Sequence, residues 1–368
     1  MSWSWSDPAV PSPFKILFLT HKTKTYDAFM DRYFVNQYRA AKRREGVEAV
    51  MWGLDFRGYN NSATIRENLV RRYGGVHFDM IFLFGVTHNH ELAALSKETV
   101  VMIREHECWG KRCEPYIIYN DCGVVQFTFS HEISQYRGLG DGRVFQHSPT
   151  CAEPRIFYRA ELDAASRPVQ VLIAGSISKD VYPLRSRMVE LVNSGRIKGA
   201  VWYKHPGYML DAQNGTSLPE PDDGGIHPLD AQVMAFAEQY RTARVCLVTT
   251  SVHKYALQKY AEAALAGCAL VGNIPHDRPD FYREFVTEVN VYDSDEHIIN
   301  TIQALLDDEP RRMKLAMIGQ KRILETSTWD HWLDITKDAY VAYKKKQFGR
   351  YYPYGYFPES HLLSILNG

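Results

Sequence analysis

The stretch TTSVHKYALQKYAEAALAGCALVGNIP, residues 249–275, decides the fold of this chain. An apolar run at residues 245–249 leads into it. The middle of the stretch predicts a helix over residues 254–266, ended by Gly267 as a left-handed cap. A second apolar run follows at residues 269–272. The order strand, helix, strand predicts parallel strands covered by helices.

The same alternation runs along the whole chain. Further strands are expected at residues 14–21, 47–52, 78–84, 116–119, 124–129, 143–146, 169–174 and 200–203, with helical patterns between several of them. We therefore expect an α/β fold with two Rossmann-like, doubly wound domains that face a central cleft. The expected division is a flexible N-terminus (1–13), a first domain (14–165), a second domain (166–328), and a C-terminal helix and aromatic tail bridging back to the first domain (329–368).

The composition is that of a globular chain and excludes several classes of protein. Its 368 residues are 45% apolar and 23% charged, which excludes intrinsic disorder. Forty-three basic residues balance forty-three acidic ones, so no overall field favours nucleic acid or an anionic membrane. No apolar run approaches the ~20 residues needed to cross a bilayer, and the N-terminus lacks a signal-peptide pattern. We expect a cytoplasmic protein with no transmembrane segment and with reduced cysteines.

Polar residues at the start of the expected helix predict a phosphate site. Ser251, Lys254 and Tyr255 would lie at its N-terminus, where unpaired N–H groups and the helix dipole favour anions. Glu262 follows two turns later, and its carboxylate can accept two hydrogen bonds from a ribose diol. An ion pair with Lys259 on the helix surface explains Glu262 equally well.

The segment KYAEAALAGCALV, residues 259–271, resembles the donor-site helix of group 1 GT-B glycosyltransferases, including their spore-maturation-protein-like branch. The family pattern is E-A-x-A-x-G-x-P-V-V, and the resemblance implies that Glu262 holds the nucleotide ribose. Many retaining members carry another Glu eight positions earlier, where this chain has Lys254. Gly175 and Ser176 resemble the entry to the family's C-terminal domain. The resemblance covers most of residues 150–345.

The resemblance implies a hexosyl- or pentosyltransferase that uses a nucleotide diphospho-sugar, such as a UDP- or GDP-sugar. The acceptor would be a hydroxyl of a glycan, a protein or a small molecule, and similarity to group 1 favours retention of the anomeric configuration. No cofactor and no metal are expected, because no Asp-x-Asp clamp follows a strand. Side chains must then stabilise the departing diphosphate. The candidates for donor binding are Gly175, Ser176, Arg185, Lys204, His205, Ser251, Lys254, Tyr255 and Glu262, with Lys254 also expected to act in catalysis.

Other activities fit the same residues. An inverting transferase needs a general base near the acceptor, for which His21, Asp121 and His131 are the candidates at expected strand ends. A nucleotide-sugar epimerase on this scaffold would need an acid/base pair and no separate acceptor. A non-catalytic protein that binds nucleotides or sugars is the third possibility. The presence of Lys254, where many retaining members of the family carry a Glu, favours it.

Overall fold

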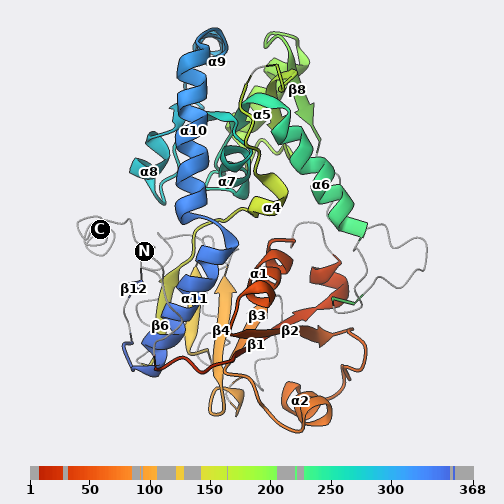
Figure 1. The fold of residues 1–368 in the computed structure, drawn as a ribbon. Helices are drawn as coiled ribbons and strands as arrows, with labels where there is room; N and C mark the ends of the chain where they lie inside the picture. Colours follow the sequence, from red (N-terminus) through yellow and green to blue (C-terminus); the bar gives the residue numbers. More distant parts are fainter. Residues whose placement is uncertain are drawn as a thin grey trace. The chain divides into compact units, whose positions relative to one another are not determined.

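The computed structural model describes residues 8–27, 32–84, 92, 94–105, 122–127, 142–163, 165–204, 220–221, 228–348 and 351–352. The chain divides into two units, each built on its own parallel sheet (Figure 1). The first unit comprises Met1–Pro149, Tyr208–Leu229 and Trp329–Gly368. The second comprises Thr150–Gly207 and Asp230–Thr328. The expectation of two doubly wound α/β sheets is confirmed.

The first unit has a seven-stranded parallel sheet in the order β12-β6-β5-β4-β3-β1-β2. The strands are β1 (Phe14–His21), β2 (Val47–Leu54), β3 (Met80–Phe84), β4 (Val100–Glu105), β5 (Val124–Phe127), β6 (Val144–His147) and β12 (Tyr351–Tyr352). The sequence pattern did not predict β4. The expected strand at residues 116–119 lies outside the described residues.

Helices α1 (Arg32–Arg43) and α11 (Trp329–Lys344) pack side by side in the first unit (Figure 1). A π-helical turn, η1 (Lys22–Tyr26), precedes α1, and α2 (Ile65–Tyr73) connects β2 to β3. Thr64 caps α2 through a capping box with Glu67, which explains the exact start of this helix.

The second unit has a five-stranded parallel sheet in the order β11-β10-β9-β7-β8. Its strands are β7 (Val169–Ala174), β8 (Ala200–Tyr203), β9 (Ala243–Val248), β10 (Ala269–Gly272) and β11 (Val286–Glu288). Its helices are α4 (Pro154–Phe157), α5 (Pro183–Asn193), α6 (Pro228–Arg241), α7 (Gln258–Leu265), α8 (Pro279–Arg283), α9 (Asp295–Asp307) and α10 (Glu309–Thr326).

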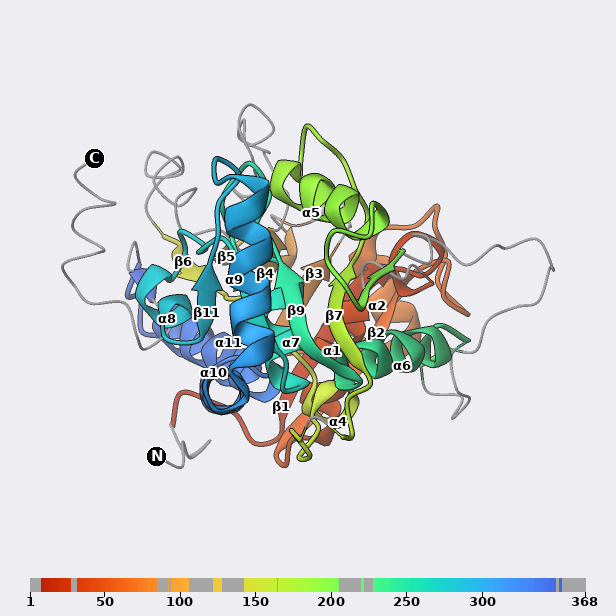
Figure 2. The same cartoon turned by 90° about the horizontal axis from the view of Figure 1, so that it is seen from above.

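One core cluster of the second unit lies between its sheet and helices α5 and α9. Val171 and Val245 point from the strands toward Met188 of α5 and Ile302 of α9, and all four are at most 1% exposed. Figure 2 shows α5 and α9 on the near side of β7 and β9. Burial of such apolar surface contributes about 25 cal/mol per Å² and fixes which strand face each helix covers.

Two segments belong to a different unit from the one that the expected division assigned them to. Residues 150–165 belong to the second unit, because Gln258 Nε2 donates to Cys151 O at 2.7 Å and Phe157 packs against Tyr240. The described residues 220–221 and 228–229 belong to the first unit. Strand and helix periodicity does not report such long-range packing, so the boundaries could not be read from it.

Both sheets share one topology that positions ligand sites. In each, the first strand lies between the second and the third, as in the order β2-β1-β3 and the order β8-β7-β9. The chain therefore runs from the first strand to one side of it, and then crosses over to the third strand on its other side. This reversal of direction is the switch point of the sheet, at the carboxyl end of the first strand. Open α/β sheets bind ligands at this switch point. The residues after β1 and after β7 are accordingly the first places to search for a site.

Candidate functional site

The carboxyl end of β7 brings two cations together in the second unit. Gly175 follows β7 directly with φ +111°, a backbone conformation that favours glycine. A Cβ atom at this position would lie 2.6 Å from Lys259 Cε and 3.5 Å from Arg185 Nη1. The glycine therefore leaves the space that both side chains need, and Arg185 and Lys259 converge over it.

Arg185 comes from the first turn of α5 and is 2% exposed. Its Nε donates to Thr249 Oγ1 at 3.2 Å, and its Nη1 donates to Ser176 O at 3.1 Å. Its guanidinium also lies 4.1 Å from the centre of the Tyr182 ring. These contacts join the ends of β7 and β9 and fix the guanidinium in one orientation. Burial lowers the pKa of Arg185 from its usual value. The described residues place no carboxylate within ion-pair distance of it.

Lys259 and Glu262 extend the cluster from α7. Both side chains are half-buried. Burial and the neighbouring charge of Arg185, opposed by the charge of Glu262, together lower the pKa of Lys259 to about 8. Burial raises the pKa of Glu262 to about 7, opposed by the charge of Lys259. The charges of the two groups therefore influence each other, although no ion pair within 4 Å joins Lys259 and Glu262.

The predicted helix start at residue 254 is wrong. Helix α7 begins at Gln258, and Lys254 is an exposed loop residue with φ +62°. The loop is held away from helical geometry because Asp277 Oδ2 accepts from Ala256 N at 2.9 Å and Lys254 O accepts from His276 N at 2.7 Å. Residues 251–255 therefore do not form a helix N-terminus, and the helix geometry on which the predicted phosphate site rested is not present there.

The other residues predicted for donor binding have separate positions. Ser251 is buried and its Oγ accepts from His253 N at 3.1 Å, while the Tyr255 ring is buried and stacks on the His253 ring. Lys204 follows the edge strand β8 and is exposed. His205 lies outside the described residues. Gly267 has φ +80° directly after α7, so the predicted left-handed cap is confirmed.

The first unit presents a histidine at its own switch point. His21 ends β1, and its Nδ1 lies 3.1 Å from Asp55 Oδ2 just beyond β2. Thr23 Oγ1 also donates to this oxygen, at 2.9 Å, and Asn61 Nδ2 donates to Asp55 Oδ1 at 2.6 Å. The Asp55 carboxylate thus orients the His21 ring through Nδ1. Asp121 and His131, the other two predicted bases, lie outside the described residues.

Sequence reasoning missed Lys259 and Asp55 as site residues. Asp55 directly follows a predicted strand, and this position could have signalled it. Lys259 gave no such signal, because its approach to Gly175 depends on how α7 packs against the end of β7. The described residues include no group of three or more His, Cys, Asp or Glu side chains suited to a metal ion.

The comparisons with known proteins agree with this geometry. Residues 226–338 match the family model for glycosyl transferase-like proteins, and this segment includes Lys259 and Glu262. An α-glucosyltransferase in complex with UDP and a 13-mer DNA containing a HMU base superposes with a TM-score of 0.58 at 7% identity, over 89% of this chain and 99% of that chain. The chain has the GT-B fold.

Two further GT-B structures agree. Sucrose-phosphate synthase from Thermosynechococcus elongatus gives a TM-score of 0.52 at 12% identity, over 88% of this chain and 98% of that chain. Anabaena HepE in complex with UDP-glucose gives 0.51 at 11% identity, with the same two coverages. No curated protein sequence matches significantly. The resemblance to GT-B glycosyltransferases of group 1 is confirmed. In the described part of this GT-B chain, no helix is long and apolar enough to cross a membrane.

Proposed function

We propose that the protein is a glycosyltransferase that transfers a hexosyl or pentosyl group from a nucleotide diphospho-sugar to an acceptor hydroxyl without a metal ion. The pair of cations at the β7–β9 switch point, Arg185 and Lys259 over Gly175, carries this proposal. A bound diphosphate would supply negative charge to balance the charges of Arg185 and Lys259. The resemblance of residues 259–271 to a donor-site helix also supports a nucleotide at this position.

Each residue of the cluster has one task in this reaction. Arg185 and Lys259 bind the diphosphate and stabilise the charge it gathers as the glycosidic bond breaks. Their charges take the place that a divalent ion occupies in metal-dependent transferases. Glu262, on the next turn of α7, accepts hydrogen bonds from the two ribose hydroxyls. Ser176, Ser251, Lys254 and Tyr255 remain candidates for contacts with the rest of the donor.

Binding of nucleotides tests the donor site. UDP, GDP and ADP are titrated calorimetrically into the wild type and into Arg185→Gln, Lys259→Met and Glu262→Gln. Loss of a hydrogen bond to a charged group costs roughly 1.5–3 kcal/mol, or about 10- to 100-fold in affinity. The matched control is Lys321→Met, an exposed lysine on α10 that pairs with Glu325. Unchanged affinity in all three folded site variants contradicts the assignment.

We propose retention of the anomeric configuration, supported by the similarity to group 1 proteins. Inversion is the second candidate, and the His21–Asp55 pair favours it because a histidine oriented by a carboxylate can act as a general base toward the acceptor hydroxyl. The anomeric configuration of the product, followed by NMR from the start of the reaction, separates the two. If the enzyme inverts, His21→Ala should lower kcat by roughly 10²–10⁴-fold.

Product analysis also separates the transferase from the other two candidates. Conversion of the nucleotide sugar to a stereoisomer, with no transfer or hydrolysis, would identify an epimerase. Tight nucleotide binding with neither conversion nor transfer would identify a non-catalytic binding protein. Either result would contradict the proposed transferase activity, but neither would contradict the proposed nucleotide-binding site.

A further inference from the structure

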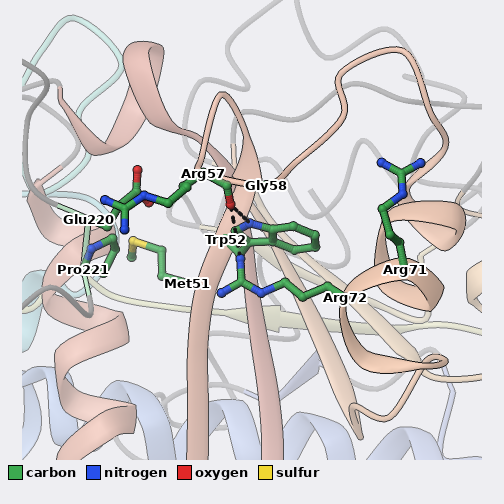
Figure 3. A pocket seen from close by; sticks show the side chains of 8 residues that line it. All are labelled: Met51, Trp52, Arg57, Gly58, Arg71, Arg72, Glu220 and Pro221. Atoms are coloured by element: carbon green, nitrogen blue, oxygen red, sulfur yellow. Dashed lines mark hydrogen bonds between the residues drawn. The ribbon is translucent and has the colours of Figure 1, made fainter.

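The first unit contains a cavity of about 420 Å³ beside the edge strand β2 (Figure 3). Figure 3 shows Arg72 below Trp52 at its centre, with Arg57 and Glu220 on one side and Arg71 on the other. This volume lies within the usual range for small-molecule sites, roughly 300–1,000 Å³. The cavity is lined by Met51, Trp52, Arg57, Gly58, Arg71, Arg72, Glu220 and Pro221.

The side chain of Arg72, an exposed residue, contacts both Trp52 and the loop after β2. Its guanidinium lies 4.5 Å from the centre of the Trp52 ring, and its Nη1 donates to Arg57 O at 3.4 Å. The same carbonyl accepts from Trp52 Nε1 at 3.1 Å. An arginine stacked on an indole in this way has lost part of its freedom already, so binding an anion costs less conformational entropy.

The described residues that line the cavity carry an excess of positive charge. Three arginines and one carboxylate line it, and that carboxylate, Glu220, lies 3.7 Å from Lys22 Nζ. Among the described residues, neither Arg71 nor Arg72 has a carboxylate within 4 Å. Their position in the last turn of α2 favours cations through the helix dipole. That effect does not explain why the Arg72 guanidinium turns toward β2.

One short loop joins this cavity to the His21–Asp55 pair. Asp55, which orients His21, lies two residues before Arg57 in the loop that follows β2. Lys22, the partner of Glu220, is the residue next to His21. All of these residues belong to the first unit. The loop after β2 therefore carries both a residue that lines the cavity and the carboxylate that orients His21.

We propose that this cavity binds the anionic group, a phosphate or a carboxylate, of a small sugar acceptor. The proposal rests on the proposed transferase function and adds the class of acceptor. Arginine matches both groups because its planar fork forms paired hydrogen bonds with two oxygens. Trp52 is 1% exposed and covered by Arg72, so it offers no face on which a nucleobase can stack. A small acidic sugar therefore fits better than a nucleic acid.

The test is equilibrium binding to the full chain without a donor. Glucose 6-phosphate, glucuronate, glucose and inorganic phosphate are titrated calorimetrically into the wild type. We expect glucose 6-phosphate or glucuronate to bind roughly tenfold or more tightly than glucose, and the preferred sugar shows which anion is recognised. Inorganic phosphate should compete with it. Equal affinity for all three sugars would overturn the proposal, as would binding of a single-stranded DNA oligomer in place of either acidic sugar.

Variants assign the binding to this cavity. Arg57→Gln combined with Arg72→Gln should abolish the preference for the acidic sugar, and Arg72→Lys should reduce it because lysine lacks the planar fork. The matched control is Arg66→Gln, which removes an arginine of α2 that pairs with Glu98 outside the cavity. An unchanged preference in the folded double variant would overturn the proposal. If the double variant does not fold, the proposal is tested by the sugar preference of Arg72→Lys and by competition between inorganic phosphate and the acidic sugar in the wild type.

The result is independent of the donor site. UDP binding, measured on the same samples, reports on Arg185 and Lys259 in the second unit. If UDP binds and neither acidic sugar does, the cavity proposal fails and the transferase proposal stands. If an acidic sugar binds and no nucleotide does, the transferase proposal fails.

Discussion

Lys259 gives the donor site a dependence on pH near neutrality. Its pKa is lowered to about 8 by burial and by Arg185, so the free protein loses this charge as the pH rises through 8. A bound diphosphate favours the charged form and raises the pKa again, so binding at pH 8 takes up a proton. We therefore expect UDP affinity to fall as the pH rises from 7 to 9. Calorimetry in two buffers of different ionisation enthalpy measures the proton uptake.

Two substitutions separate Lys259 from other titrating groups. Lys259→Arg keeps its charge over this range, so its UDP affinity should change little between pH 7 and 9. Lys259→Met should bind UDP more weakly at pH 7 and also lose the dependence. A dependence that persists in both variants would assign the titration to another group and contradict the role of Lys259.

At the scale of elements, strands were predicted better than the start of the donor-site helix. Strand β10 and the end of α7 follow from local signals, an apolar run and a glycine with φ +80°. The start of α7 follows from long-range bonds instead. Asn273 Oδ1 accepts from Thr250 N at 3.0 Å and Asp277 Oδ2 accepts from Ala256 N, so side chains from beyond β10 hold the loop extended. No local pattern reports a contact across more than twenty residues.

Asp277 should therefore control both the loop before α7 and the stability of the second unit. Asp277 is 4% exposed, and Asp277→Ala leaves Ala256 N without its acceptor. An unsatisfied buried donor costs roughly 1–3 kcal/mol, so the free energy of unfolding in urea should fall by this amount. Hydrogen exchange at Ala256 and its neighbours should accelerate. Asp277→Asn keeps an acceptor oxygen and should lose less; equal losses in both variants would contradict this role of the hydrogen bond.

The sequence predicted the two sheets, but not which unit each segment of the chain belongs to. The sequence pattern predicts two sheets, since each strand and helix carries its own apolar period. Assignment of segments to the two units depends on contacts between distant residues, such as Arg43 with Asp330 in the first unit. The candidate site divides in the same way. Glu262 was identified from the pattern around it, whereas Lys259 and Asp55 emerged only from packing.

The chain returns to the first unit in α11, and the stability of that unit should depend on this last helix. Trp332 of α11 is fully buried, with its ring 5.2 Å from the Phe82 ring in β3 and 6.3 Å from the Phe18 ring in β1. Its Nε1 donates to Gln126 Oε1 at 3.1 Å. Trp332→Ala should lower the free energy of unfolding by roughly 3–5 kcal/mol, because it leaves a cavity in the core.

Hydrogen exchange measures where this loss is felt. In Trp332→Ala, the amides of β1 and β3 should exchange faster, since their core contact with α11 is gone. Trp332→Phe keeps most of the packing and loses the hydrogen bond to Gln126, so it should cost less and serves as the matched control. The amides of β7 and β9 provide an internal comparison. If β1 and β3 keep their protection in the alanine variant, α11 does not stabilise the first sheet through Trp332.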